Sequence, residues 1–159
     1  MNINITRLTS TAKLPERGSA FAAGYDLFAD INEDTVIKSH ETVMIGTGLA
    51  LEIPESYWGG VFARSGLSAK EGLRPANCTG VVDSDYRGEV KVALHNDSEV
   101  ERTVTPLEKI AQLVVVPFLS VEFEEVDKLS DTARGEGGFG HTGVYCYLEK
   151  NLTTENMRF

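Results

Sequence analysis

The sequence predicts an all-β protein with one short helix. Most of the chain consists of short runs of β-branched or apolar residues separated by turn residues such as glycine and proline, a pattern typical of strands. Between Glu89 and Leu94, apolar side chains occupy every second position, which indicates a half-buried strand. Only one segment, which starts near Ser65, has a helical pattern. Several short strands at this spacing predict a β-sandwich or barrel.

The expected strands follow one another along most of the chain. Gly46 and Gly48 interrupt a β-branched and apolar stretch, and a turn at Pro54 separates it from an aromatic-rich run. Pro117 marks an edge or a bend, because proline lacks the N–H that a central strand needs. The predicted strands are residues 35–37, 42–53, 57–63, 89–94, 110–116 and 121–126.

The predicted helix and a predicted hairpin lie between these strands. Ser65 is the expected N-cap, because its hydroxyl can accept a hydrogen bond from a free amide of the first turn. Gly72 is expected to end the helix in the left-handed conformation. Residues 80–88 predict a hairpin with Asp83, Ser84 and Asp85 at or near its tip. The helix is so short that it needs tertiary support.

The composition excludes several classes of protein. The 159 residues include 15 Lys and Arg against 24 Asp and Glu, a net charge of −9, which argues against direct nucleic-acid binding. A few convergent arginines can still bind a small anionic substrate. No apolar run is long enough to span a bilayer, and we expect neither a secretory signal nor a disulfide framework. A cytoplasmic location is expected, or a nuclear one if the source is eukaryotic or viral.

The segment 134–143 is the most unusual in composition, because five of the protein's 15 glycines lie in it. Bare glycine amides can approach an anion closely. Arg134 offers a bidentate fork for phosphate, and Thr142 offers a hydroxyl donor. The ring of Phe139 could cover a flat base by stacking. The alternative is a flexible surface loop with one stray aromatic residue.

Arg64, Ser65 and Gly66 lie where a strand leads into the predicted helix. Free amides at a helix N-terminus favour negative charge, and an adjacent arginine strengthens such a phosphate site. The alternative is that Ser65 only caps the helix while Arg64 is solvated.

Two aspartates are candidates for chemistry. Asp83 follows the apolar pair Val81 and Val82, so partial burial is expected to raise its pKa and suit it to act as a general base toward water. Asp26 could hold a hydrated Mg²⁺, an ion that keeps several waters. Asx-turns and turn capping are the alternatives for these residues. Neither a zinc-ligand spacing nor a nucleophile-elbow motif is present.

Taken in order, five segments resemble the five motifs of the trimeric deoxyuridine triphosphatases (dUTPases). The resemblance covers roughly residues 5–143. The segments are residues 23–27, 64–67, 80–88, 109–113 and 134–143.

The resemblance implies a jelly-roll-like β-barrel with one short helix and a flexible C-terminal arm. It implies a homotrimer whose active sites are shared between subunits, and Mg²⁺-assisted hydrolysis of dUTP to dUMP and pyrophosphate. This reaction keeps uracil out of DNA and supplies dUMP for thymidylate synthesis. The corresponding domain organisation is a barrel over residues 1–133, a glycine-rich lid over 134–143 and a loosely ordered extension over 144–159.

The resemblance also implies a role for each matching residue. Asp83 matches the general base that activates water toward the α-phosphorus, and Tyr86 matches the residue that packs on the deoxyribose and excludes ribonucleotides. The uracil edge is read by Asn77 and by the backbone of Gly80, Val81 and Val82, with the main chain of Lys91 lining the same pocket. The remaining matches are phosphate contacts at Arg64, Ser65, Gly66 and Gln112, a metal contact through water at Asp26, and substrate contacts in the arm at Arg134, Phe139, Gly140, His141 and Thr142.

The sequence departs from the family pattern at four places, one of which is Ser68, where the family commonly has alanine. His141 stands where the family usually has serine, Leu107-Glu108-Lys109 replaces Gly-Asp-Arg or Gly-Asp-Lys, and residues 144–159 extend beyond the usual end. Two alternatives remain within the same fold, namely a dCTP deaminase-like enzyme and a non-catalytic nucleotide-sensing module. The residues Asp83, Gln112 and Arg134 favour the hydrolase, because a pure binding module needs no general base.

Overall fold

The computed structural model describes residues 1–138, and it confirms the all-β class with one short helix. The chain divides into two units, residues Met1–Val121 and Glu122–Phe159, and all strands and the helix described lie in the first. The helix is α1 (Ser65–Glu71). The strands are β1 (Asn4–Arg7), β2 (Glu16–Arg17), β3 (Tyr25–Phe28), β4 (Thr35–Ile37), β5 (Thr42–Gly46), β6 (Leu49–Glu52), β7 (Tyr57–Phe62), β8 (Leu73–Pro75), β9 (Thr79–Val82), β10 (Lys91–Asn96), β11 (Arg102–Val104) and β12 (Lys109–Pro117).

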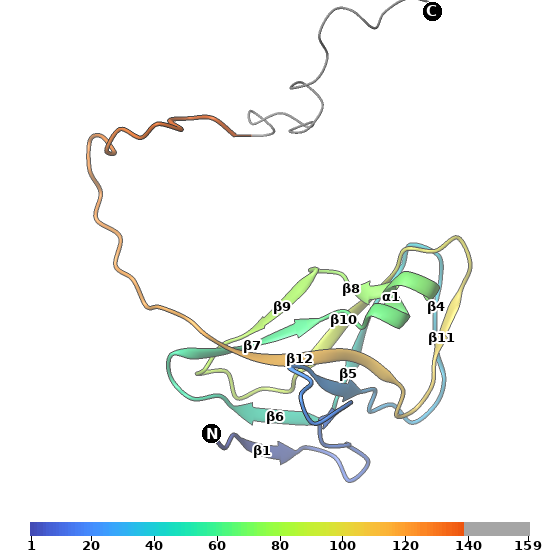
Figure 1. Cartoon of the computed structure of the whole chain (residues 1–159). Helices are drawn as coiled ribbons and strands as arrows, with labels where there is room; N and C mark the ends of the chain where they lie inside the picture. The colour runs from blue at the N-terminus through green and yellow to red at the C-terminus, as the bar shows by residue number, and fades with distance from the viewer. Residues whose placement is uncertain (139–159) are drawn as a thin grey trace, which may run out of the picture. The chain divides into compact units, whose positions relative to one another are not determined.

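The strands form four antiparallel sheets (Figure 1). The largest has the order β2-β3-β12-β7-β9, and β5-β10-β8 forms a second sheet. The pairs β1-β6 and β11-β4 complete the arrangement. Within residues 1–138 these ladders do not join into one closed barrel, because β9 and β2 remain the edges of the largest sheet.

One hydrophobic core is shared by strands of different sheets. In β10, Val92 and Leu94 are buried while Lys91 is exposed, so the predicted alternation is confirmed. Burying each such aliphatic side chain contributes about 1.5–3 kcal/mol. The side chains in the core with almost no exposure are Leu27, Ile37, Ile45, Leu49, Leu73, Leu94, Val104 and Ile110.

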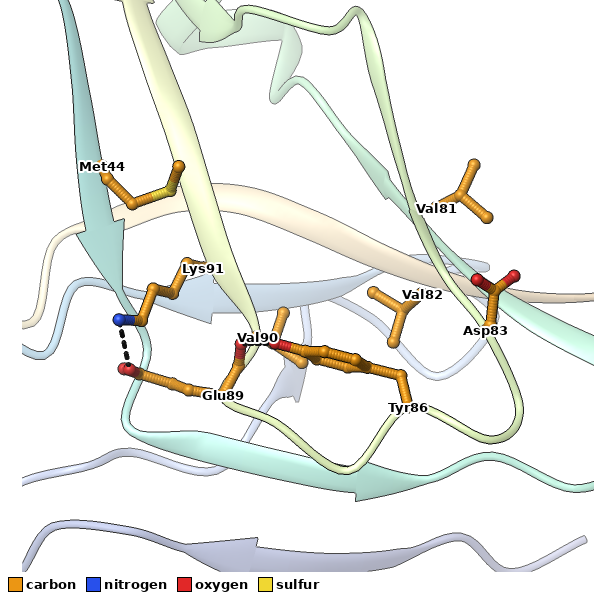
Figure 2. A pocket seen from close by; sticks show the side chains of 8 residues that line it. All are labelled: Met44, Val81, Val82, Asp83, Tyr86, Glu89, Val90 and Lys91. Atoms are coloured by element: carbon orange, nitrogen blue, oxygen red, sulfur yellow. Dashed lines mark hydrogen bonds and ion pairs between the residues drawn. The ribbon is translucent and has the colours of Figure 1, made fainter.

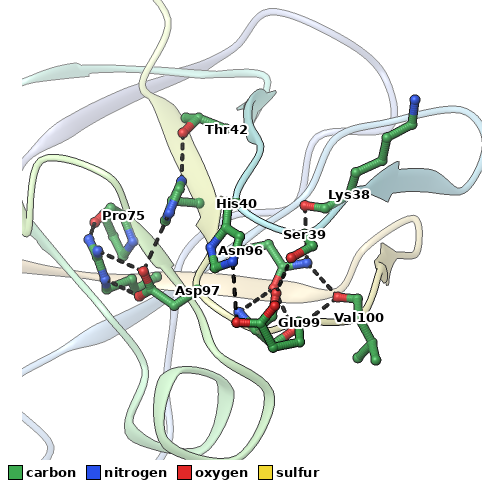
Figure 3. A network of polar contacts seen from close by, with 12 residues as sticks. Lys38, Ser39, His40, Thr42, Pro75, Asn96, Asp97, Glu99 and Val100 are labelled. Atoms are coloured by element: carbon green, nitrogen blue, oxygen red, sulfur yellow. Dashed lines mark hydrogen bonds and ion pairs between the residues drawn. The ribbon is translucent and has the colours of Figure 1, made fainter.

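A buried amide, Asn96, closes the end of β10 (Figure 3). Its Nδ2 donates to the carbonyl oxygens of Ile37 at 3.0 Å and Val100 at 2.8 Å, and its Oδ1 accepts from the Ser98 amide at 2.9 Å. Because an unpaired buried polar group costs about 1–3 kcal/mol, this amide holds the ends of β4 and β10 together.

The ends of α1 match the prediction only in part. Gly72 has φ +74° and ends the helix in the left-handed conformation, as predicted. The predicted N-cap is wrong: Arg64 occupies the cap position and Ser65 is the first helical residue, with no side-chain hydrogen bond capping the helix. A hydroxyl caps only from the residue before the first turn, and Ser65 lies one residue too late. Leu67 is buried and anchors the helix.

Two other expectations are wrong. Residues 121–126 belong to none of the strands described, and Val121 and Phe123 are exposed. A strand needs a partner for its backbone groups, and none of the ladders within residues 1–138 includes this segment. Residues 80–88 are not a hairpin either, because β9 pairs with β7 whereas β10 pairs with β5 and β8. The loop after β9 therefore crosses from one sheet to another.

Two further observations concern thiols and membranes. Cys78 is a free, exposed thiol, and Cys146 lies outside the described residues. Within residues 1–138, no helix combines the length and the hydropathy that a membrane-crossing segment needs.

Candidate active site

A pocket of about 320 Å³ lies beside the loop that joins β9 to β10 (Figure 2). This volume is at the lower end of the range of small-molecule sites. Four of the predicted site residues that line it come from β9 and the following loop, and a fifth, Lys91, comes from β10. The lining residues are Met44, Val81, Val82, Asp83, Tyr86, Glu89, Val90 and Lys91.

Because β9 is an edge strand, it has backbone groups that are free to bind a ligand. One row of its N–H and C=O groups bonds to β7, with Gly80 opposite Val61 and Val82 opposite Gly59. The other row has no ladder partner among the described strands. An unpaired strand edge offers alternating donors and acceptors, the pattern that the edge of a nucleobase requires.

Asn77 lies close to this edge. It occupies a tight turn in which the Cys78 amide donates to the Pro75 carbonyl at 3.1 Å, with Cys78 at φ +60°. The side-chain amide nitrogen of Asn77, Nδ2, lies 3.4 Å from the position that a Cβ on Gly80 would take. The structure therefore places Asn77 beside Gly80.

The carboxylate of Asp83 is exposed in the single chain, so its expected partial burial is wrong. Successive strand residues point to opposite faces: Val82 enters the core, whereas Val81 is 63% exposed and Asp83 follows on the same side. Within the described residues the Asp83 carboxylate accepts no hydrogen bond. Tyr86 lies in the same loop, and its amide donates to the Asp83 carbonyl at 3.2 Å.

A second cluster of predicted site residues surrounds Asp26. Arg64 Nε lies 2.9 Å from Asp26 Oδ1, and Lys109 Nζ lies 2.8 Å from Asp26 Oδ2. The register of β3 and β12 places Asp26 directly opposite Gln112. Gln112 Nε2 donates to the Ala63 carbonyl at 2.9 Å, which brings it next to the start of α1.

The environment of Asp26 holds its pKa below the usual range. Partial burial by itself raises the pKa, but the hydrogen bond from Lys109 and the charge and hydrogen bond of Arg64 together outweigh it. The carboxylate is therefore ionised at neutral pH, with both oxygens already paired to cations.

These contacts bear on the Mg²⁺ that the family resemblance implies. Within residues 1–138, no three His, Cys, Asp or Glu side chains are grouped to hold a metal ion. Mg²⁺ commonly binds one or two carboxylates, substrate phosphates and several waters. A carboxylate oxygen has two lone pairs, so Asp26 can still accept a hydrogen bond from a metal-bound water. The residues fit a hydrated ion held mainly by a substrate.

Ser65 and Gly66 present the first amides of α1 beside this cluster. The first amides of a helix have no intrahelical acceptor, and the first turn of α1 contains no acidic side chain. No atom lies within 4 Å of the position that a Cβ on Gly66 would take, so its backbone is open to a ligand. The cluster of Arg64, Ser65, Gly66, Lys109 and Gln112 can therefore bind a phosphate chain.

The pocket and this cluster are not brought together within one chain. In the β12-β7-β9 ladders, Val82 lies opposite Gly59, whereas Gln112 lies opposite Phe62. The offset along the strands is roughly 10 Å, and the two strand spacings add roughly 10 Å across them. Asp83 and Gln112 therefore lie near opposite ends of the same sheet.

The predicted residues of the arm belong to the second unit or lie outside the described residues. Arg134 Nε donates to the Gly137 carbonyl at 2.7 Å, and the Gly137 amide donates to the Arg134 carbonyl at 3.1 Å. This segment therefore forms a local turn. Phe139, Gly140, His141 and Thr142, and the extension 144–159, lie outside the described residues.

Sequence reasoning missed Lys109 and Glu89 as site residues. Lys109 contacts Asp26, and Glu89 lines the pocket next to Lys91. Lys109 stood in a recognisable segment, but only the strand register shows that its side chain reaches Asp26. For Glu89, the sequence showed only its place in the alternating run 89–94, which did not indicate a role in the site.

Comparisons with known proteins point to one family. Residues 10–143 match the dUTPase family model. A deoxyuridine 5'-triphosphate nucleotidohydrolase of Hydrogenobaculum sp. (strain Y04AAS1) is 43% identical over 144 residues, which cover 91% of this chain and 99% of that relative. A variant dUTPase of Staphylococcus bacteriophage 80alpha with dUpNHpp has a TM-score of 0.83 at 31% identity, and the match covers 90% of this chain and 99% of the other.

A second solved structure concerns a metal. A variant dUTPase from phage phi11 of S. aureus, described with a structural Mg(II) ion, has a TM-score of 0.75 at 27% identity. The match covers 82% of this chain and 100% of the phage chain.

Proposed function

This chain belongs to the dUTPase family and is a dUTP diphosphatase, and from that premise we propose how its residues hydrolyse dUTP to dUMP and pyrophosphate. Two parts of the site carry the proposal, and both lie within the matched residues 10–143. The first is the pocket that Asp83 and Tyr86 line, called the Asp83 pocket. The second, called the Arg64–Gln112 cluster, consists of Arg64, Ser65, Gly66, Lys109 and Gln112. The product dUMP is a precursor for thymidylate, and removal of dUTP keeps uracil out of DNA. We place the reaction in the cytoplasm.

The proposed base recognition uses the free edge of β9. The backbone of Gly80, Val81 and Val82 offers donors and acceptors to the uracil edge, and Asn77 completes the set beside Gly80. The 4-amino group of cytosine would place a donor against a donor of the β9 edge. The 5-methyl group of thymine would be too bulky for the pocket. Lys91 also lines the pocket, and we assign its main chain to the same recognition of the base.

Sugar recognition is assigned to Tyr86. Its ring lines the pocket, and a flat ring packed on the deoxyribose leaves no space for a 2′-hydroxyl. UTP is therefore expected to be a poor substrate.

The triphosphate is bound by the cluster at the start of α1. Arg64 supplies a fork of donors, Ser65 and Gly66 supply free amides, and Gln112 supplies an amide group. Mg²⁺, which we propose as the cofactor, would neutralise charge on the triphosphate and on the departing pyrophosphate. Asp26 would hold such an ion through a water, while its own charge remains paired with Arg64 and Lys109.

The chemical step is a displacement at the α-phosphorus. The Asp83 carboxylate accepts a proton from water as the water oxygen forms a bond to that phosphorus. The bond between the α-phosphorus and the bridging oxygen breaks, and pyrophosphate leaves with the bonding electrons. The donors of Arg64 and Gln112 stabilise the charge that develops.

One chain cannot place both halves of this site on one substrate, because Asp83 and Gln112 lie near opposite ends of the β12-β7-β9 ladders. We propose a homotrimer in which one copy contributes the Asp83 pocket and another contributes the Arg64–Gln112 cluster. Closed rotational symmetry repeats such a head-to-tail contact around a ring.

We assign the segment 134–143 to a lid over the shared site, with Arg134 at the γ-phosphate and Phe139 stacked on the uracil. Gly140, His141 and Thr142 supply further contacts. A lid excludes water and completes the charge clamp only when substrate is present. A chain that ends at residue 133 should therefore keep its oligomeric state and lose turnover of dUTP. A fully active truncated protein would contradict the lid.

The test of the proposed function is pyrophosphate release from dUTP, dCTP, dTTP and UTP, each with Mg²⁺ and with EDTA. Metal-dependent release from dUTP alone is the expected result. Release of ammonia from dCTP would instead indicate a deaminase. Binding of dUTP with no product in either assay would indicate a nucleotide-sensing module.

A further inference from the structure

The wall of the pocket formed by Glu89 is held by contacts that the catalytic proposal does not use. The side chain of Glu89 is 26% exposed. Its Oε1 accepts a hydrogen bond from the Gly48 amide at 2.9 Å, and its Oε2 lies 3.2 Å from Lys91 Nζ (Figure 2). Both oxygens of this carboxylate are therefore engaged.

The turn between β5 and β6 is built around this carboxylate. A Cβ on Gly46 would overlap with the Glu89 carboxylate, so only glycine allows the approach. The next residue, Thr47, is fully buried, and its hydroxyl donates to the Val90 carbonyl at 2.7 Å. The Val90 amide donates to the Leu49 carbonyl at 2.8 Å. Side-chain and backbone bonds thus attach residues 89 and 90 to the same turn.

The backbone of Glu89 in turn holds the ring of Tyr86. The Tyr86 hydroxyl donates to the Glu89 carbonyl oxygen at 3.0 Å. A Cβ on Gly88 would overlap with the Tyr86 hydroxyl and ring, so the ring lies directly against the Gly88 backbone. Tyr86 is 46% exposed, and so this hydroxyl bond and the glycine determine where the ring lies.

We propose that Glu89 is a positioning residue for sugar selection. Its carboxylate anchors the residue 89 carbonyl to the β5–β6 turn, and that carbonyl sets the Tyr86 ring against the deoxyribose. The proposal rests on the proposed function, in which Tyr86 excludes the 2′-hydroxyl. Loss of the carboxylate leaves the Gly48 amide without its acceptor and releases the Lys91 ammonium, so the ring can retreat and admit a ribose.

The experiment compares Glu89→Ala and Glu89→Gln in the full chain, using the ratio of kcat/KM for dUTP to kcat/KM for UTP. Glu89→Ala should lower this ratio about tenfold, since small displacements of positioning groups have effects of this size or larger. Glu89→Gln keeps an oxygen for the Gly48 amide and should retain most of the ratio. An unchanged ratio in folded Glu89→Ala overturns the proposal.

Glu41→Ala is the matched control. The Glu41 carboxylate also accepts a bond from a turn amide, that of Lys38 at 2.9 Å, but Glu41 does not line the pocket. It should leave the ratio unchanged. An equal fall in the ratio for Glu41→Ala would attribute the Glu89 effect to general loosening and overturn the proposal.

Tyr86→Phe removes only the hydroxyl that bonds to the Glu89 carbonyl, so it tests this contact even if Glu89→Ala does not fold. It should lower the ratio, and Glu89→Ala should have little further effect in the Tyr86→Phe background, because both changes act through one contact. An unchanged ratio in Tyr86→Phe, or strictly additive effects, overturns the proposal. Absence of dUTP turnover in the unaltered chain would instead refute the proposed function itself.

Discussion

The two halves of the candidate site differ in how completely a single chain organises them. Around Asp26, Arg64 and Lys109 occupy both carboxylate oxygens, and Gln112 is bonded to the Ala63 carbonyl. At the other end of the sheet, the Asp83 carboxylate is exposed and accepts no hydrogen bond within the described residues.

This contrast separates two tasks that the site performs. Donors that stabilise a developing negative charge are most effective when they are organised before the reaction, and the Arg64–Gln112 cluster meets this condition in one chain. A general base needs a water and a substrate within reach, and these would come with the neighbouring copy. We infer that assembly of the oligomer supplies the missing neighbours of the Asp83 pocket and leaves the contacts of the Arg64–Gln112 cluster nearly unchanged.

The largest expected effect on turnover comes from a substitution of Asp83, the exposed carboxylate. Asp83→Asn should lower kcat for dUTP by about 100-fold or more, the scale of lost general-base catalysis, with little change in KM. Steady-state kinetics with dUTP measure it. Asp85→Asn, two residues away and also exposed, is the matched control and should retain kcat. Near-normal turnover in Asp83→Asn would remove Asp83 from its role.

Mixing two inactive variants tests whether the halves come from different copies. Asp83→Asn and Arg64→Ala each damage one half, so co-expressed chains should regain about a quarter of the normal activity, the fraction of sites with both halves intact in randomly mixed closed rings. The measurement is dUTP turnover of the purified mixed oligomer. Activity no higher than the sum of the two variants would place both halves on one chain.

The sequence predicted the elements that depend on local patterns. The alternation at Val92 and Leu94 predicted a strand with one buried face, and Gly72 predicted the left-handed end of α1; both are confirmed. The stretch 42–53, which the sequence predicts as one strand interrupted by Gly46 and Gly48, is divided there into β5 and β6. In each case the determining factor is the residue's own backbone conformation or the position of its side chain on one face.

Features that depend on distant partners were not predictable in this way. The turn residues of 80–88 predicted a hairpin, but they do not say that β9 pairs with β7 and not with β10. The burial expected for Asp83 failed because the two valines before it point to opposite faces. The approach of Asp26 to Gln112 follows from strand register, and only the family resemblance indicated that these two segments share a site.

The ion pairs of Asp26 with Arg64 and Lys109 should make the stability of the protein depend on pH. A carboxyl with a lowered pKa stabilises the folded state fully above its unfolded pKa, which is near 3.8, and the stabilisation is lost as the pH falls through the folded value. Asp26→Asn should therefore lower the free energy of unfolding by about 1.5–3 kcal/mol at pH 7, as expected for hydrogen bonds to a charged group. The difference should shrink below pH 3.8.

Urea unfolding at pH 7 and at several values below pH 4 measures this difference. Asp34→Asn removes an exposed carboxylate for which no side-chain contact is described, and it should change stability by less than about 0.5 kcal/mol. If the loss for Asp26→Asn were the same at every pH, the ion pairs would not be its cause.

The smallest expected effect concerns the turn that leads into the organised end. Leu107 has φ +62°, a left-handed conformation, at the position where the family usually has glycine. Its amide donates to the Ala29 carbonyl at 2.9 Å, and the Ala29 amide donates to the Glu108 carbonyl at 2.8 Å, so the turn retains its bonds despite the substitution. The left-handed conformation costs a residue with a side chain about 1–2 kcal/mol.

Leu107→Gly should therefore raise the free energy of unfolding by about 0.5–1 kcal/mol, because glycine relieves this strain at the cost of some extra chain entropy. The Leu107 side chain is 48% exposed, so little burial is lost. Leu14→Gly, at a comparably exposed leucine without positive φ, should destabilise the protein. Because Lys109 and Gln112 are held by their own contacts, kcat for dUTP should stay unchanged in Leu107→Gly. A fall in kcat would mean that the positions of Lys109 and Gln112 depend on the strained conformation of this turn.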